Sequence, residues 1–313
     1  MLKVKVDNDF EFPASWEVFL FNEREQWKQQ SDGFKSFVLL NAEVVSARIT
    51  FIIQNNVAYS PFRAPFGSVE FRKDLSVASL QFFLNKVETE LSALGVKKIR
   101  ITSWPDCYDQ ASASKLTKAY LDSAYKVVFR EMNFHLPVNG EFKDHVHPSL
   151  SRRLIKSANL YSVDINGNPD LKEIFLLIRQ NREMKGLPLT INLPALENLY
   201  RNFQDKFLVF EGRRDSRLVA VSFGIIVNKN ILYYFLPADD YAFKHDSPML
   251  LVLEKMYEYC RENNFKIFDL GIATSKEFPN WGLINFKRRL GGKESLKLSF
   301  GKEIDMIYRN VFL

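Results

Sequence analysis

Asp269 is the residue of this chain whose position most directly suggests proton transfer. It lies near the carboxyl end of a predicted buried strand, residues 266–271. A carboxylate at such a strand end can take the proton of an attacking amine or hold that amine in place. It can equally cap a neighbouring turn or pair with an arginine, so both interpretations of Asp269 stay open.

Tyr233 and Tyr234 lie on another predicted strand, residues 231–236. Successive side chains of a strand point to opposite faces, so only one of these hydroxyls can face a cleft beside Asp269. The other tyrosine belongs to the core. The sequence pattern does not decide between them, and both are candidate catalytic residues.

Two basic clusters are candidate sites for an anionic partner. Arg152, Arg153 and Lys156 begin a predicted helix, residues 147–159, in which Arg152 and Lys156 share one face at i and i+4. The second cluster, in which Glu294 is the only acidic residue, contains Lys287, Arg288, Arg289, Lys293, Lys297 and Lys302. Such clusters favour phosphates, nucleotides, tRNA or an anionic membrane surface, with a solvated face as the alternative.

The elements that position Asp269 follow one another in a short stretch of chain. After the strand at 231–236, Ser247 and Pro248 have the residue types preferred at the N-cap and first position of a helix. That helix ends near residue 264, and the strand at 266–271 follows. Strand, helix and strand in this order predict a parallel strand pair joined by a crossover.

A weaker copy of this arrangement occurs about 170 residues earlier. Strands are predicted at 48–53 and 57–59, a helix at 76–94 that Gly95 caps, and a strand at 97–102. Duplication explains the repeat most simply, and a chance match of two common units is the alternative.

The length of 313 residues favours two domains, which we place at 1–140 and 141–313. The boundary is a turn at 138–141. A long strand or hairpin is expected just before it, at 126–136. The other predicted helices are 112–124, 171–185 and 193–202, and the other predicted strands are 207–210 and 218–227.

Composition excludes several classes of protein. Hydrophobic residues make up 46% of the chain, with 28 Phe and 12 Tyr, which is typical of an ordered globular protein, and the net charge is +6. The sequence has no run of 18 apolar residues and no apolar signal region at its start, so we expect a cytoplasmic protein without a transmembrane segment. Cys107 and Cys260 fall in different predicted domains, and His145 and His147 lack ligands at metal-binding spacing. We therefore expect no disulfide and no metal site.

The segments around these elements resemble those of a known family. The run at 247–251, the Phe-Asp-Leu-Gly at 268–271 and the segment 282–291 resemble FemABX-type aminoacyltransferases and relatives with a duplicated GNAT-like fold. Residues 151–158 and 181–188 resemble that family's segments at the entry to the second domain. The resemblance implies an α+β (α/β) fold of two tandem GNAT-like domains, each a mixed central sheet flanked by helices. It also implies a degenerate first domain and an active-site cleft in the second.

The activity that the resemblance implies is transfer of an acyl group to an amine. In this family the donor is often aminoacyl-tRNA and the acceptor a peptidoglycan precursor, whereas other relatives use acyl-CoA or modify polysaccharides. We therefore expect a transferase of cell-wall biogenesis that acts on an anionic acceptor and has no permanently bound cofactor. Its partners would include tRNA and, peripherally, the inner face of the membrane.

The resemblance also implies roles for individual residues. Lys287 matches the lysine of the family's Phe-Lys motif, which holds a phosphate or the acyl donor; a surface cation is the alternative. Arg288 is a weaker candidate because consecutive helical residues point in different directions. Asn181 and Arg182 match cleft-lining positions, and Arg63 lies in a proline-rich loop that can meet the acceptor's phosphate. Ordinary helix-end polarity and a purely structural loop are the respective alternatives.

One departure from the family lies at the helix that starts with Ser247. GNAT enzymes hold the diphosphate of CoA at the start of this helix, in a glycine-containing loop. Here residues 242–247 contain no glycine, and Asp246 adds negative charge that Lys244 and His245 only partly offset. The equivalent loop of the first half, residues 71–75, also lacks glycine. The alternative function is therefore a catalytically silent module that binds a nucleotide-linked or other anionic ligand.

Overall fold

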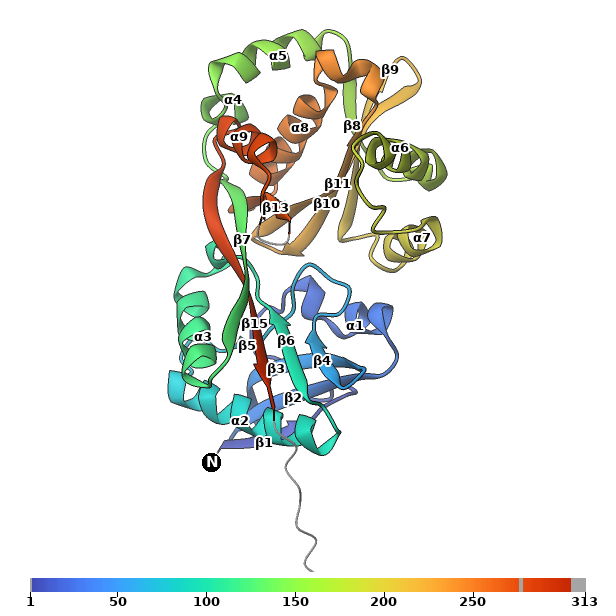
Figure 1. Cartoon of the computed structure of the whole chain (residues 1–313). Coiled ribbons are helices and arrows are strands. Elements are labelled where there is room, and N and C mark those ends of the chain that lie inside the picture. The colour runs from blue at the N-terminus through green and yellow to red at the C-terminus, as the bar shows by residue number, and fades with distance from the viewer. Residues whose placement is uncertain (1, 276–277, 305–313) are drawn as a thin grey trace, which may run out of the picture. The chain divides into compact units, whose positions relative to one another are not determined.

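The computed structural model describes residues 2–275 and 278–304, and these form two compact units. Of the described residues, unit 1 contains 2–133, 274–275, 278 and 295–304. Unit 2 contains 134–273 and 279–294. In the described residues one mixed sheet of 13 strands supplies strands to both units, and helices flank its part in each unit (Figure 1). The strands β7 and β15 pass from one unit into the other.

Unit 1 is built mainly from the first half of the chain. Its elements up to β7 are β1 (Leu2–Val6), η1 (Leu20–Asn22), α1 (Arg24–Gln30), β2 (Phe34–Asn41), β3 (Val44–Gln54), β4 (Val57–Ser60), β5 (Glu70–Phe71), α2 (Val77–Ala93), β6 (Lys98–Thr102), η2 (Asp106–Tyr108), α3 (Gln110–Asp122) and β7 (Lys126–Pro137). The sheet order is β1-β2-β3-β4-β6-β15-β7, and β5 pairs with β3. The strand β15 (Lys293–Glu303) thus returns from the far end of the sequence to pair with β6.

Unit 2 holds the second half. Its elements are α4 (Phe142–His145), α5 (Pro148–Ala158), β8 (Ser162–Asn166), α6 (Leu171–Met184), α7 (Leu193–Asn202), β9 (Phe207–Arg214), β10 (Arg217–Asn228), β11 (Ile231–Asp239), η3 (Tyr241–Asp246), α8 (Pro248–Glu262), β12 (Ile267–Ile272) and α9 (Trp281–Arg289). A small pair, β13 (Thr274–Ser275) and β14 (Phe278–Pro279), precedes α9. The sheet runs from the last residues of β7 through β12, β11, β10 and β9 to β8. The helix α8 packs on β9, β10 and β11, and α6 packs on β10 and β11 from the other side (Figure 1).

Both units contain the predicted parallel pair. In unit 1, β4 and β6 are parallel and are joined through α2. In unit 2, β11 and β12 are parallel and are joined through α8. The two halves therefore share one order of elements, strand, helix, parallel strand and helix, as the prediction of tandem GNAT-like domains requires.

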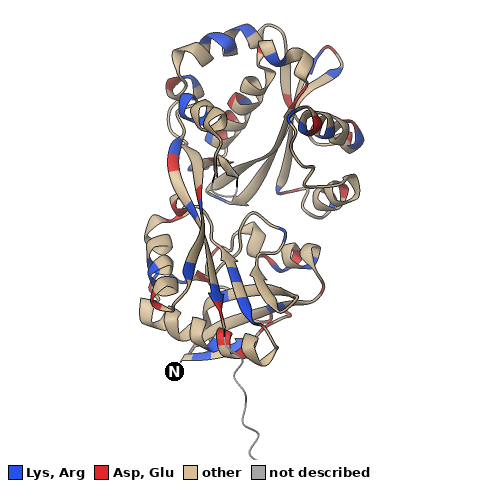
Figure 2. Ribbon diagram, viewed as in Figure 1, with Lys and Arg blue, Asp and Glu red and all other residues tan. Residues whose placement is uncertain are grey.

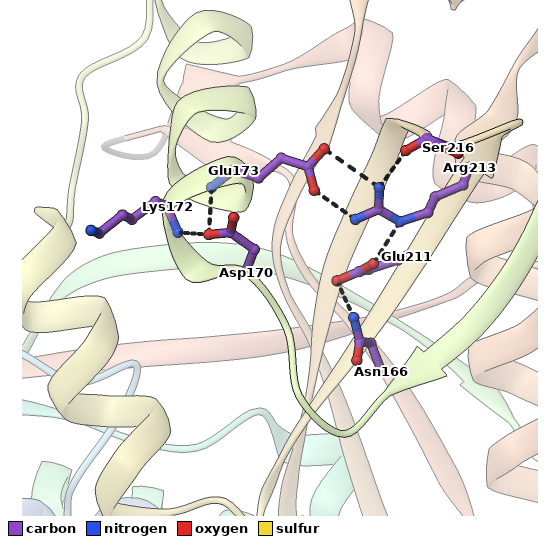
Figure 3. A network of polar contacts seen from close by, with 7 residues as sticks. All are labelled: Asn166, Asp170, Lys172, Glu173, Glu211, Arg213 and Ser216. Atoms are coloured by element: carbon purple, nitrogen blue, oxygen red, sulfur yellow. Dashed lines mark hydrogen bonds and ion pairs between the residues drawn. The ribbon is translucent and has the colours of Figure 1, made fainter.

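A network of charged side chains fixes α6 to the edge of the unit 2 sheet (Figure 3). The buried Glu211 of β9 accepts hydrogen bonds from Asn166 Nδ2 at 3.0 Å and from Arg213 Nε at 2.9 Å. The same Arg213 guanidinium donates to Glu173 of α6, with an N–O distance of 2.6 Å. Hydrogen bonds from Arg213 to Glu173 raise the pKa of the arginine, and Glu211 adds to this effect. Charge pairing thus holds β8, β9 and α6 in one arrangement.

The predicted elements are present with small differences at their ends. Residues 126–136, expected as a strand or a hairpin, form the single strand β7. Residues 242–246, expected as a loop, belong to the 3₁₀ helix η3, so that expectation was wrong. The proposed division into domains 1–140 and 141–313 stays a prediction. The compact units follow it up to residue 133, whereas β15 joins unit 1 from Ser295 onward.

Candidate active site

The strands β11 and β12 of unit 2 separate where the candidate residues lie. Their pairing begins at Ile231 with Ile267 and ends at Tyr233 with Asp269. Beyond that point both strands continue without further pairing to each other. On its other edge β11 has a bulge against β10, and Leu236 there has a φ of 49°. Beyond such an opening, the backbone groups of the two strands need hydrogen-bond partners other than each other.

Asp269 lies at the last pair before this opening and is buried, with 2% of its surface exposed. Its Oδ1 accepts a hydrogen bond from the backbone N–H of Gly271 at 2.8 Å. Gly271 has a φ of +74°, a region that residues with a side chain rarely adopt. The carboxylate therefore stabilises a tight turn at the end of β12, which is the capping contact that was one of its two interpretations. A catalytic role of Asp269 stays a prediction.

Lys287 is buried beside the same turn. The helix α9 begins at the N-cap Asn280, whose side chain accepts a hydrogen bond from Leu283 N at 3.1 Å. Lys287 Nζ donates to the carbonyl oxygens of Gly271 and Ile272, each at 2.8 Å. Its side chain is only 4% exposed. Lys287 is therefore not a surface cation.

Burial lowers the pKa of Lys287 to about 7, although the nearby Asp269 carboxylate acts in the opposite direction. A neutral amine has two N–H donors and one lone pair. Both hydrogen bonds of Nζ run to carbonyl acceptors, so the neutral form satisfies them and keeps its lone pair. Near neutral pH this amine can therefore accept a proton, and its ammonium form can donate one.

The two tyrosines of β11 take different places. Tyr233 pairs with Asp269, and its ring lies 3.3 Å from the position that a Cβ on Gly271 would take. Tyr234 packs edge-on against the buried Phe268, with ring centroids 6.3 Å apart. Burial raises the pKa of Tyr234, and Asp239 adds to the shift. The structure therefore brings Tyr233 to the Asp269 turn and packs the half-buried Tyr234 against Phe268.

Asp246, just before α8, is hydrogen-bonded to residues of α5 and to Tyr161, which follows that helix. The carboxylate of Asp246 accepts hydrogen bonds from Lys156 Nζ at 3.0 Å and from Tyr161 Oη at 2.9 Å. The hydrogen bond from Lys156 is the main cause of the lowered pKa of Asp246. Ser157 Oγ also donates to the backbone oxygen of Asp246. Lys156, predicted to bind an anionic acceptor, is thus paired within the chain.

Ser247 occupies the N-cap position of α8, as predicted, but its side chain makes no capping hydrogen bond. Its backbone is left-handed, with a φ of 59°. The contacts of Asp246 with α5 hold the preceding turn, so the chain bends sharply at Ser247 before it enters the helix. Pro248 has no N–H, and the N–H of Leu250 is bonded to the Ser247 carbonyl, which reduces the donors left for an anion.

Comparison with known proteins identifies this architecture. Residues 151–288 match the model of the acetyltransferase (GNAT) domain. The structure of FemX superimposes with a TM-score of 0.71 at 12% sequence identity and covers 92% of each chain. The chain has a FemABX-like GNAT acyltransferase fold. A tandem GNAT protein from the clavulanic acid biosynthesis pathway gives a TM-score of 0.53 at 10% identity, with 87% of this chain and 83% of that chain covered.

L-PGS from Bacillus licheniformis is a third similar structure, with a TM-score of 0.52 at 14% identity, covering 82% of this chain and 80% of that chain. No curated protein matches the sequence. The matched domain model is that of an acetyltransferase and covers the larger part of unit 2. Tyr233 and Asp269 lie where β11 and β12 separate, and Lys287 contacts the last residues of β12 close to them.

The other basic candidates of the GNAT-like unit 2 lie on its surface. Arg152 and Arg153 are exposed on α5, where Figure 2 shows a row of Lys and Arg residues. Arg288 follows the buried Lys287 but points outward, and its Nε donates to Glu294 Oε1 at 2.7 Å. The two neighbours thus point in different directions, as expected for a helix. Their binding roles stay predictions.

The remaining candidates are Asn181 and Arg182 on α6 and Arg63 in unit 1. Asn181 Nδ2 donates to the backbone oxygen and to Oδ1 of Asp239, both at 2.7 Å, so it fastens α6 to the end of β11. Arg182 is half-buried beside it. Arg63 belongs to unit 1, where its backbone N–H donates to Gln30 and its guanidinium lies over the Phe62 ring. Substrate binding by these residues stays a prediction.

In the described residues there is neither a membrane-spanning helix nor a cluster of metal ligands. No helix there is long and apolar enough to cross a membrane. No group of three or more His, Cys, Asp or Glu residues in that part is placed to hold a metal ion. His145, expected in a loop, ends α4 and contacts Tyr257 Oη at 2.7 Å, whereas His147 is the N-cap of α5.

Sequence reasoning missed the burial of Lys287, although a signal was present. Ile284, Lys287 and Leu290 recur every three residues, and both apolar members of this row are fully buried. The row places the lysine on the inward face of α9. Gly271 was also missed as a separate feature, although a glycine inside a strand pattern indicates a bulge or a close approach of the backbone.

Proposed function

We propose that the protein is an N-acyltransferase whose reaction takes place in unit 2, at the opening between β11 and β12. The observation that carries the proposal is the buried Lys287, whose pKa lies near 7 and whose Nζ contacts two carbonyls at the end of β12. A buried amine that changes charge near neutral pH costs stability and is typical of a functional site. The FemABX-like GNAT fold supports acyl or aminoacyl transfer as its use.

The proposed step begins with the acceptor amine, whose nitrogen attacks the carbonyl carbon of the donor. As the new C–N bond forms, the carbonyl electron pair moves to its oxygen, and an N–H proton of the amine passes to neutral Lys287 Nζ. Collapse of the tetrahedral intermediate breaks the bond to the leaving group, and the Lys287 ammonium returns the proton to it. Asp269 stabilises this ammonium and holds the turn in place, and Tyr233 lines the opening beside it.

The start of α8 favours an aminoacyl ester such as aminoacyl-tRNA as the donor over acyl-CoA. Asp246 adds a negative charge there, Pro248 lacks an N–H, and the Leu250 N–H is already bonded. These features weaken the anion site that a CoA diphosphate would need. The exposed arginines of α5 are suited to an RNA backbone or to the phosphates of a cell-wall precursor. We propose such a precursor as the acceptor, in line with the similarity to FemX.

Two measurements test this function. Thermal unfolding is compared with aminoacyl-tRNA and with acetyl-CoA, because a ligand that binds the native state raises its apparent stability. Transfer from each labelled donor to a UDP-linked muropeptide is then followed with wild type, Lys287→Met and Asp269→Asn. We expect transfer from the aminoacyl donor and its loss in Lys287→Met. Salt-sensitive binding without transfer from either donor would instead support the silent binding module.

A further inference from the structure

Few apolar side chains hold the helix α9, which carries Lys287. Of its nine residues only Ile284 and Lys287 are buried, and the buried Leu290 follows at its C-cap. Helices as short as this one are stabilised by tertiary contacts more than by their own propensity. The contacts at the ends of α9 therefore decide how deeply Lys287 lies.

The carboxyl end of α9 lies directly against the segment that ends α4 and begins α5. His147 N donates a hydrogen bond to the backbone oxygen of Arg289 at 2.7 Å, and the Arg289 guanidinium donates to Ser149 Oγ. At Gly291 the approach is closer still. A Cβ at this residue would overlap the backbone oxygen of His145 and lie 2.9 Å from the His145 Cβ. Any side chain at residue 291 would therefore force the two segments apart.

His145 is itself fixed to α8. Its Nε2 atom lies 2.7 Å from Tyr257 Oη and 2.7 Å from the backbone oxygen of Asn139. The Asn139 N–H donates to the same hydroxyl at 3.0 Å, and the centroids of the His145 and Tyr257 rings are 5.2 Å apart. Tyr257 is fully buried on α8, which packs on the sheet. Because His145 is held in this way, an overlap at Gly291 would displace α9 rather than His145.

A displacement of Gly291 would carry Lys287 with it. Four residues, about one helical turn, separate the two, and Gly292 N donates to the backbone oxygen of Lys287 at 2.9 Å. Lys287 Nζ reaches the carbonyl oxygens of Gly271 and Ile272 at 2.8 Å each, and such hydrogen bonds extend to about 3.2 Å. An outward shift of α9 by about 1 Å would exceed this range. Water would then reach the amine and favour its charged form.

We propose that the contact between Gly291 and His145 positions the amine of Lys287 for the proposed proton transfer. The missing side chain at residue 291 lets α9 lie deep enough for Nζ to reach the carbonyls of Gly271 and Ile272, and His145 is the stop that limits this depth. Gly291 and His145 are positioning residues that act through Lys287. The inference rests on the proposed function for the role of Lys287, whereas the placement of the amine is tested without any transfer.

Gly291→Ala tests this placement against a control with the same backbone strain. Gly291 has a φ of +83°, and Gly95, which follows α2, has a φ of +80° and nothing within 4 Å of the position of a Cβ. Alanine is strained at both residues, but only at 291 must it displace a helix. For wild type and each variant, the free energy of unfolding in urea is compared with that of the same protein carrying Lys287→Met, from pH 7 to pH 9.

We expect this difference to rise with pH in wild type and in Gly95→Ala. In Gly291→Ala it should rise less than half as much, because a hydrated lysine is charged in both the folded and the unfolded chain over this range. A rise in Gly291→Ala as large as that of wild type would overturn the proposal.

Substitutions of His145 test the stop itself and do not depend on whether Gly291→Ala folds. His145→Ala removes the ring and should show the reduced rise with pH, whereas His145→Gln keeps an N–H donor and should restore it. His147→Ala is the matched control, because the His147 ring is bonded to Ser149 on α5 and its backbone N–H is unchanged. A rise as large as that of wild type in His145→Ala, or an equal reduction in His147→Ala, would overturn the proposal.

Single-turnover acyl transfer separates this inference from the proposed function. In Gly291→Ala the rate at pH 7 should fall about 100-fold, as for a misplacement of about 1 Å, and the midpoint of its pH profile should move up by at least about one pH unit. Transfer by Gly291→Ala at the wild-type rate and midpoint would overturn the placement. Absence of transfer in wild type, with the expected pH dependence of unfolding, would overturn the proposed function and support the placement.

Discussion

Replacing Lys287 by methionine should change how the stability of the protein depends on pH. The lysine has an ordinary pKa of 10.5 and a pKa of about 7 in the fold, where burial disfavours its charge. Below pH 7 the side chain is protonated in both folded and unfolded chains. Between pH 7 and 10.5 the unfolded chain binds the extra proton, so stability rises with pH in this window. Methionine has a similar shape and does not titrate.

The size of the effect follows from the shift. One pKa unit corresponds to roughly 1.4 kcal/mol, and the folded lysine is already half deprotonated at pH 7, so the free energy of unfolding of wild type should rise by about 2 kcal/mol relative to Lys287→Met between pH 7 and pH 9. The full window is worth about 5 kcal/mol. The two proteins share all other titrating groups, so the contributions of those groups cancel when the two free energies of unfolding are subtracted.

Urea unfolding at half-unit steps from pH 6 to pH 9.5 measures this difference, with fluorescence and far-UV circular dichroism as probes. Lys293→Met is the matched control, because Lys293 is exposed near the same segment. Its difference from wild type should stay flat with pH. A flat difference for Lys287→Met as well would show that Lys287 is hydrated and fully charged in the native protein. The proposed proton transfer would then lose its basis.

Three further substitutions test other parts of the structure. Burial raises the pKa of Glu70 to about 7, so between pH 4.5 and 7 the folded chain binds one proton more than the unfolded chain. The free energy of unfolding of wild type should therefore fall by about 3 kcal/mol relative to Glu70→Gln across that range, as measured by urea unfolding. Gly271→Ala should lower stability by about 1–2 kcal/mol, because alanine is strained at a φ of +74°, and an unchanged unfolding midpoint would refute the left-handed turn. Asn181→Ala removes both hydrogen bonds to Asp239 and should cost about 1–3 kcal/mol in the same assay, whereas exposed Asn202→Ala should have little effect.

Local sequence signals predicted the elements that depend on neighbouring residues. Pro248 marked the start of α8, and Gly95, with a φ of +80°, follows α2 as expected of a helix cap. The helix α7 has the predicted bounds Leu193–Asn202. The parallel pairs of both halves followed from the order strand, helix, strand. In each case the sequence signal lies within one stretch of about 45 residues or fewer.

Features that depend on distant residues were not predicted. The strand β15 pairs Phe300 with Ile101, and nothing in its local pattern specifies a partner 199 residues away. The backbone conformation of Ser247 depends on contacts of the neighbouring Asp246 with α5. This helix lies about 90 residues earlier in the sequence. A propensity for N-caps describes the side chain of Ser247 alone, so it missed this constraint.

The candidate site also combines residues that local sequence patterns identify with tertiary contacts that they do not. The sequence singled out Asp269 and Lys287 as separate candidates for catalysis. Their meeting at Gly271 requires α9 to return to the end of β12, a tertiary contact that no local spacing encodes. The pKa of Lys287 depends on that burial, so its chemistry became visible only with the fold.

The pH dependence of single-turnover acyl transfer tests the central claim most directly. Aminoacyl-tRNA is the donor and a UDP-linked muropeptide the acceptor, and wild type is compared with Lys287→Met and the control Lys293→Met. If neutral Lys287 takes the proton of the amine, the rate of wild type and of the control rises with pH with a midpoint near 7, and Lys287→Met loses at least about 100-fold. A Lys287→Met variant that transfers at the wild-type rate with the same pH profile would contradict the account.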